Sequence, residues 1–367
     1  MTSFYKKIFP VKFLNYWKKN RIKFSFNKEL QNITDDFLKS KSEKFISNYW
    51  NILAINHYSY ILKDKGVSGY GSSIARWYST ILLIDNNLEK LLNVFSKFKI
   101  DLKKVEFCKI HKNFTVVESA NYNYICCLLF NFIKKNKKLK FLSKLQKKSY
   151  LNFDTPFLKI ENFKVSSDMM ISLLDYFKIE RLVNFKKDKI ILEIGAGSGR
   201  LSDCILTLNK NTKYLICDIV PSYYLSYKRL KASFPDKKIC CLNSEDNQPE
   251  VIKEKINKND IIFIYPSHLS MLSKRSIDCT ICVNFLQEVN KKTVLEYFNI
   301  INFISKKLYL SVFKNTKNWY SGTLFKKTEK YDFFKGDYDI PNKWKKVFVE
   351  ELYYPSSQIC AAYLLKD

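Results

Sequence analysis

The segment "ILEIGAGSGR" at Ile191–Arg200 decides the fold, because it concentrates glycine in a chain that otherwise has little of it. Gly195, Gly197 and Gly199 occupy alternate positions there, whereas the whole chain of 367 residues contains 8 glycines. The apolar run "KIILEI" precedes them, and the amphipathic stretch "LSDCILTL" follows. Glycine permits positive φ angles and a close approach of backbone to ligand, and free amides at a helix start attract negative charge. We therefore predict a nucleotide-binding loop between a strand and a helix.

The sequence around this loop predicts an α/β fold. From about residue 186, short apolar runs alternate with helix-like stretches; the runs are "KIILEIG", "KYLICDI", "KKICCLN", "DIIFIYP", "IDCTICVNF" and "KLYLSVF". Continuous apolar strands alternating with helices predict a parallel sheet covered on both faces. Near the end, "WKKVFVEELYYP" and "SQICAAYLLK" flank a "PSS" turn and predict an antiparallel hairpin. The expected fold is a Rossmann-like, doubly wound, mostly parallel sheet that ends in this hairpin.

The N-terminal part has a different texture. Residues 1–150 show helical spacing of apolar and aromatic positions, so we expect a mainly helical cap or lid region there, followed by the Rossmann-like domain at 151–367. A second glycine cluster in "KGVSGYGSS" is either a flexible connection or a mobile loop over a site. Aromatic residues flank it, suited to core packing or to stacking on a sugar: Tyr58, Tyr60, Tyr70, Trp77 and Tyr78. Our hypothesis is that these helices cover the acceptor site.

The spacing of the first glycine loop indicates its ligand. A dinucleotide fingerprint that starts at Gly195 would need a small residue where this chain has Arg200. The chain instead has an acidic residue two places before the three alternate glycines, a pattern that resembles the first motif of class I S-adenosylmethionine-dependent methyltransferases. That resemblance implies that Glu193 and the loop hold the methionine end of the cofactor, S-adenosyl-L-methionine. Asp218 ends the next predicted strand, where a carboxylate can accept from both ribose hydroxyls. The predicted cofactor-binding residues are Glu193, Gly195, Gly197, Gly199 and Asp218.

A closer resemblance covers roughly residues 155–367. The segments "ILEIGAGSGRL", "DIVPSYYLSYKRL", "IIFIYPSHLSML" and "IDCTICVNFLQEV" together resemble the sugar O-methyltransferase family of bacterial surface-polysaccharide gene sets. Pro221, His268 and Glu288 fall on that family's pattern, with an extra serine between Pro266 and His268. The resemblance implies methyl transfer to a sugar hydroxyl during the synthesis of O-antigen, capsule or a related glycan.

Two residues are candidates for the catalytic base. A sugar hydroxyl must lose its proton as it attacks, which calls for a positioned base. His268 and Glu288 both follow predicted strands, so both are expected at the ligand-binding edge of the sheet. Alternatively, His268 packs on adenine or caps the next helix, and Glu288 forms a salt bridge at a helix start. His57 is more typical of a core or interface histidine.

Charge and cysteine usage bear on partners and location. The net charge is +28, but six residues are arginine, so the bias matches drift in an AT-rich coding sequence better than a polyanion site. We therefore expect a small-molecule or glycan acceptor and no nucleic acid, with peripheral contact to an anionic membrane surface as a secondary expectation. The ten cysteines predict reduced thiols and a cytoplasmic protein, and no segment is expected to cross a membrane. Cys279 and Cys282 form a lone CxxC, read as two buried strand residues rather than a metal site.

Other readings stay open at this point. The positive charge leaves room for a methyltransferase that acts on RNA or protein, which salt-sensitive RNA binding would support. A cofactor-binding module without turnover is a second alternative, and a nicotinamide-dependent redox enzyme is a third. Glu245 and Asp246 are either metal ligands or a solvated turn, and no metal site is predicted.

Overall fold

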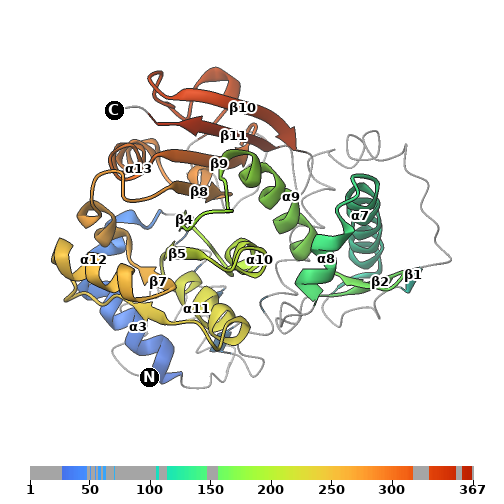
Figure 1. Cartoon of the computed structure of the whole chain (residues 1–367), viewed down its shortest axis with the longest axis horizontal. Coiled ribbons are helices and arrows are strands. Elements are labelled where there is room, and N and C mark those ends of the chain that lie inside the picture. Colours follow the sequence, from blue (N-terminus) through green and yellow to red (C-terminus); the bar gives the residue numbers. More distant parts are fainter. Residues whose placement is uncertain are drawn as a thin grey trace, which may run out of the picture.

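The dominant element of the protein is an eight-stranded sheet with helices on both sides (Figure 1). The computed structural model describes residues 27–47, 50, 54, 57–58, 61–62, 70, 105–106, 114–146, 156–316, 330–352 and 358–365. Within these ranges the strand order is β10-β11-β9-β8-β4-β5-β7-β6. The strands are β4 (Lys189–Ile194), β5 (Thr212–Cys217), β6 (Ile239–Cys241), β7 (Ile261–Ile264), β8 (Cys279–Val283), β9 (Lys307–Phe313), β10 (Lys345–Leu352) and β11 (Gln358–Leu364).

The sheet is parallel except for one strand. β11 is antiparallel to both of its neighbours, β9 and β10, and all other pairings are parallel. The chain therefore passes to the edge of the sheet at β10 and returns through β11. β4, which leads into the glycine loop, lies in the middle between β5 and β8. The predicted doubly wound, mostly parallel sheet with a closing antiparallel hairpin is confirmed.

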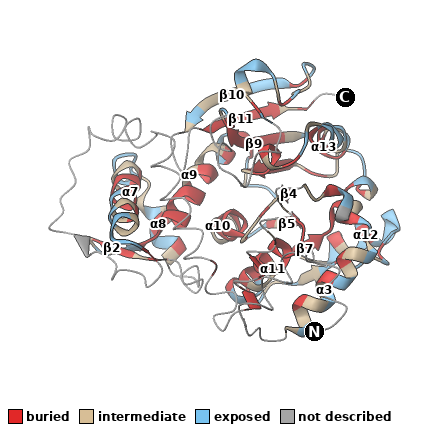
Figure 2. Ribbon diagram, turned by 180° about the vertical axis from the view of Figure 1, so that it is seen from behind, coloured by how far each residue is buried: buried red, intermediate tan, exposed pale blue. Residues whose placement is uncertain are grey.

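Both faces of the sheet are buried at its central strands, such as β7 and β8, which explains their continuous apolar runs. Side chains alternate along a strand, so Ile191 and Tyr214 join one core cluster while Leu192 and Leu215 join the other. Figure 2 shows the helices turning their buried sides toward the sheet. The first cluster is covered by α9 (Ser167–Leu182), α10 (Arg200–Leu208) and α11 (Ser222–Ser233), and the second by α12 (Pro249–Lys258) and α13 (Lys291–Ile304).

The described N-terminal part combines helices with a small sheet. α3, α7 and α8 fit the predicted helical region, and α7 begins with a capping box between Thr115 and Glu118. The three-stranded sheet β1-β2-β3 was not predicted, because strands of two or three residues leave no period in the sequence. Leu30 and Ile125 belong to the same core cluster as Ile191. The domain boundary at residue 150 stays a prediction. The bounds are α3 (Lys28–Lys39), β1 (Val105–Glu106), α7 (Val116–Lys135), α8 (Leu139–Gln146), β2 (Leu158–Ile160) and β3 (Phe163–Val165).

Short 3-10 turns complete the loops around the sheet. They are η1 (Ser42–Phe45), η4 (Pro266–Met271), η5 (Leu286–Glu288) and η6 (Phe333–Lys335). η4 follows β7 and η5 follows β8, so both lie at the carboxyl ends of parallel strands, the edge where open α/β sheets bind ligands. The glycine loop after β4 and Asp218 after β5 share this edge.

The described residues also bear on the expectations for the CxxC pair, for a metal site and for membrane-spanning helices. Cys279 and Cys282 are fully buried free thiols in β8. Among these residues no group of three or more His, Cys, Asp or Glu is arranged to hold a metal ion. Within the same part of the chain, no helix has the length and apolarity that crossing a bilayer requires.

Candidate active site

The three glycines of the loop have different surroundings. All three have positive φ angles, 77° at Gly195, 59° at Gly197 and 71° at Gly199. A Cβ at Gly195 would lie 2.7 Å from Phe285, and one at Gly199 would lie 3.0 Å from Ser226, so these two positions are closely packed. Around Gly197 the described atoms leave open space. The middle of the loop is therefore the part that can meet a ligand.

Asp218 is bonded directly to this loop. One carboxylate oxygen accepts from the Gly197 N–H at 2.7 Å, and the other accepts from the Ile219 N–H at 2.7 Å. Burial raises the pKa of Asp218 to about 7, against the two amide hydrogen bonds, which lower it. Each carboxylate oxygen can accept a further hydrogen bond. The structure thus brings together the glycine loop and Asp218, which the sequence had placed on successive strands.

Glu193 lies inside the sheet core, two residues before the loop. It is 2% exposed, and its carboxylate accepts from the Tyr214 hydroxyl at 2.8 Å. Burial raises the pKa of Glu193 to about 8, although the Tyr214 bond and the charge of Arg200 oppose this rise. Near neutral pH the neutral form of this side chain is therefore favoured.

Arg200, the residue that departs from the dinucleotide pattern, is the first residue of α10. Its guanidinium donates to the Ser172 hydroxyl at 3.1 Å and lies 3.7 Å from the Asp175 carboxylate, both on α9. The second buried arginine, Arg229 on α11, pairs with Asp203 at 3.1 Å. Both arginines thus join neighbouring helices next to the loop, so their role is to support it.

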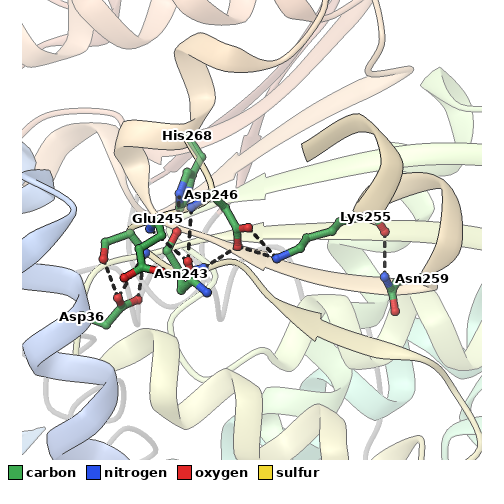
Figure 3. A network of polar contacts seen from close by, with 8 residues as sticks. Asp36, Asn243, Glu245, Asp246, Lys255, Asn259 and His268 are labelled. Atoms are coloured by element: carbon green, nitrogen blue, oxygen red, sulfur yellow. Dashed lines mark hydrogen bonds and ion pairs between the residues drawn. The ribbon is translucent and has the colours of Figure 1, made fainter. Parts of the chain in front are cut away.

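The structure places His268 in η4, where both ring nitrogens are hydrogen-bonded; Figure 3 shows its contact with Asn243. Nδ1 accepts from the Tyr265 N–H at 3.0 Å, so Nε2 carries the proton and donates to the Asn243 carbonyl at 3.1 Å. Burial lowers the pKa of His268, which favours this neutral form. The two bonds tie the turn after β7 to the loop after β6.

The loop after β6 is fixed by a polar network (Figure 3). The Asp246 carboxylate accepts from the Asn243 N–H at 2.9 Å and pairs with Lys255 at 2.5 Å. Asp36 of α3 accepts from the Ser244 hydroxyl at 2.6 Å. Asp246 therefore stabilises the turn after β6 through its bonds to Asn243 and Lys255.

A segment of the N-terminal region runs along this edge of the sheet; we call residues 27–47 the strap. Glu29 pairs with Lys228 of α11 at 3.0 Å, and Ser42 donates to the Ser267 hydroxyl in η4 at 3.0 Å. With the Asp36 contact, the strap touches the elements that follow β5, β6 and β7. The predicted lid loop at Gly66, Gly69 and Gly71 lies outside the described residues, as do Tyr60, Trp77 and Tyr78.

Glu288 is half-buried in η5 and receives a hydrogen bond from the Trp50 indole. Burial raises the pKa of Glu288 well above its usual range; the Trp50 bond lowers it, and the nearby charge of Asp218 raises it. Trp50 packs on His57, with ring centroids 5.6 Å apart, and His57 packs on Tyr70 at 4.8 Å. Burial lowers the pKa of His57 to about 4, as suits a core histidine. Glu288 therefore lies within electrostatic reach of Asp218.

Sequence reasoning missed three residues of this site. Phe285 backs the glycine loop, Tyr214 holds Glu193, and Trp50 reaches Glu288 from a distant part of the chain. None of them belongs to a motif, and only the position of Phe285 directly after β8 could have drawn attention to it.

Comparisons with known proteins give a weak likeness. No family model matches this sequence, and no curated protein matches it. A magnesium protoporphyrin IX methyltransferase from Synechocystis PCC 6803, crystallised with bound SAH, is 14% identical; the match covers 54% of this chain and 86% of that one, with a TM-score of 0.38. A SAM-dependent methyltransferase from Aquifex aeolicus is 12% identical over 53% of this chain and 92% of its own, with a TM-score of 0.34. Both matches extend over about half of this chain.

Proposed function

We propose that this protein is an S-adenosylmethionine-dependent O-methyltransferase that acts on a sugar hydroxyl. The observation that carries the proposal is the hydrogen bond between Asp218 and the N–H of Gly197, the loop glycine around which the described residues leave open space. The loop amides suit the carboxylate of the methionine end, and the remaining lone pairs of Asp218 suit the two ribose hydroxyls. Gly195 and Gly199 hold this cradle against Phe285 and α11.

Glu193 is proposed to balance the ammonium of the methionine end. Its carboxyl group has the Tyr214 hydroxyl as a hydrogen-bond donor, and burial raises its pKa to about 8, so a cation nearby would favour the charged form. Cofactor binding is then accompanied by release of a proton from this group.

When bound, the cofactor supplies an electrophilic methyl group on sulfur. The protein's part is to align the acceptor oxygen with that methyl, to exclude water and to remove the hydroxyl proton. We assign the proton to Glu288, because it directly follows the buried strand β8 at the ligand-binding edge of the sheet, and because burial and the nearby charge of Asp218 both raise its pKa, which makes its carboxylate a stronger base. His268, the other candidate, is proposed to hold the loops after β6 and β7, since both of its ring nitrogens are bonded to the backbone.

The proposed setting is surface-polysaccharide synthesis in the cytoplasm, with peripheral contact to the inner face of the membrane through the basic surface. The sugar assignment rests on the sequence resemblance, and the net charge of +28 is the feature that favours the alternative of an RNA acceptor.

Methyl transfer from radiolabelled S-adenosylmethionine tests the assignment. The acceptors to compare are nucleotide sugars, methyl glycosides, lipid-linked oligosaccharide, total RNA and a protein extract. We expect label in a sugar fraction that is lost in Glu288→Gln. Label in RNA or protein instead would contradict the sugar assignment, and no transfer to any fraction despite cofactor binding would favour a module without turnover.

A further inference from the structure

Gln287 has an unusual environment. It lies in η5 and is 2% exposed, yet within the described part of the chain neither its amide oxygen nor its amide nitrogen has a hydrogen-bond partner. Burying an amide without partners costs free energy, so native structures seldom keep one without a reason. A residue of the same type provides the comparison: Gln358 is also 2% exposed, but it donates to Asn284 at 2.7 Å and accepts from Ser311 at 3.2 Å.

The position of Gln287 relates it to the proposed reaction. It directly precedes Glu288, whose pKa is affected by the charge of Asp218. Two residues earlier, Phe285 packs against Gly195 of the glycine loop. On either side of Gln287 and Glu288, the side chains of Leu286 and Val289 are buried in the same core cluster as residues of α13. This burial fixes the turn that contains Gln287. The Gln287 amide, which has no partner among the described residues, thus lies in a buried turn two residues after the side chain that contacts the glycine loop.

We propose that the Gln287 amide binds the methyl acceptor through hydroxyl groups next to the one that reacts. This inference rests on the proposed function and names a residue that selects the acceptor. The amide offers two N–H donors and a carbonyl acceptor, and neighbouring hydroxyls of a pyranose can satisfy both because each hydroxyl donates and accepts. A phosphate would satisfy the N–H groups only, would leave the carbonyl unpaired and would face the Glu288 carboxyl. The site therefore favours an uncharged, hydroxyl-rich ring over a phosphorylated group.

If Gln287 has this role, replacing it should weaken binding of the acceptor without lowering the stability of the ligand-free protein. Gln287→Met keeps the length of the side chain and removes a buried amide that has no partner, so the ligand-free variant should melt at the same or a higher temperature. Gln358→Met is the matched control: it breaks two hydrogen bonds and should lower the melting temperature. A purely structural role for Gln287 would make both variants less stable.

The binding experiment uses protein saturated with S-adenosylhomocysteine and a mixture of the methyl pyranosides of glucose, mannose, galactose, rhamnose and fucose. Saturation-transfer NMR should show contact with at least one of them in the native protein and in Gln358→Met, with at least a fivefold weaker signal in Gln287→Met. Affinity for S-adenosylhomocysteine, measured by calorimetry, should change by less than twofold in Gln287→Met.

The outcomes separate this inference from the proposed function. A lower melting temperature in Gln287→Met, an unchanged pyranoside signal, or no pyranoside contact in the native protein would each overturn the inference while S-adenosylhomocysteine still binds. Failure of the native protein to bind S-adenosylhomocysteine would overturn the proposed function itself.

Discussion

The carboxylate of Asp218 accepts a hydrogen bond from the Gly197 N–H at 2.7 Å, which joins the end of β5 to the loop after β4. Gly197 is the loop glycine with open space around it, whereas its two partners are closely packed. The contact therefore lies where a ligand can reach both the backbone N–H groups of the glycine loop and the carboxylate of Asp218.

The loop glycines should respond differently to alanine. The Cβ of Gly197→Ala would meet no atom of the described residues within 4 Å, but the residue keeps a φ of 59°, so we expect a stability loss of about 1 kcal/mol together with a clear loss of cofactor affinity. Gly195→Ala would place its Cβ 2.7 Å from Phe285, so it should mainly impair folding. Thermal melts and calorimetry on both variants check this. The prediction would be contradicted if the ratio of lost cofactor affinity to lost melting temperature were the same in Gly197→Ala and Gly195→Ala.

Glu193 should make stability depend on pH. Its pKa rises from 4.5 to about 8 on folding, so the folded state holds the proton more tightly and this contribution to stability is lost as pH rises through that window. The slope contributed by this group is at most about 1.4 kcal/mol per pH unit. In Glu193→Gln the decline in melting temperature between pH 5 and pH 8 should be smaller. Glu254→Gln, at an exposed site, serves as the control and should leave the profile unchanged.

The two base candidates should be separable by kinetics. Glu288→Gln should lower kcat by about 10²- to 10⁴-fold with little change in cofactor affinity. His268→Gln should lower the melting temperature, because it disturbs the bonds to Tyr265 and Asn243, but it should leave the pH dependence of kcat/KM in place. Loss of the ionisation in the pH profile of the His268 variant, with Glu288→Gln still active, would reverse the assignment.

Trp50 should tune the ionisation of Glu288. Its indole donates to the carboxyl and lowers the pKa of Glu288, so Trp50→Phe should raise that pKa further. The rising limb of kcat/KM against pH would then move to higher pH, since more alkaline conditions are needed to form the carboxylate. A limb that stays in place, measured with the acceptor found for the native protein, would show that the ionisation belongs to another group.

The fold was largely predictable from the sequence because its signals are local. Each predicted strand, from "KIILEIG" to "SQICAAYLLK", forms a strand of the sheet. Burial on both faces leaves continuous apolar runs in the central strands β4, β5, β7, β8 and β9. Asp218 met the loop because carboxyl ends of neighbouring parallel strands share an edge. The strand order, in which β7 lies between β5 and β6, is not a local property and could not be read in this way.

The candidate site was predictable only in part. The bond between Trp50 and Glu288 joins residues far apart in the chain, and no spacing in the sequence indicates it. The chemistry of His268 depends on two backbone groups, the Tyr265 N–H and the Asn243 carbonyl, which only the folded loops bring to its ring. The sequence likewise could not show that the buried Gln287 amide has no partner among the described residues, because this depends on how the surrounding side chains pack.

The central claim, that the loop and Asp218 bind S-adenosylmethionine, is tested most directly by calorimetric titration. We expect S-adenosylhomocysteine to bind the native protein and NAD not to bind, and we expect Asp218→Ala to weaken S-adenosylhomocysteine by about tenfold or more, since hydrogen bonds to a charged group are worth about 1.5–3 kcal/mol. Binding of NAD in place of S-adenosylhomocysteine, or unchanged affinity in Asp218→Ala, would contradict the account.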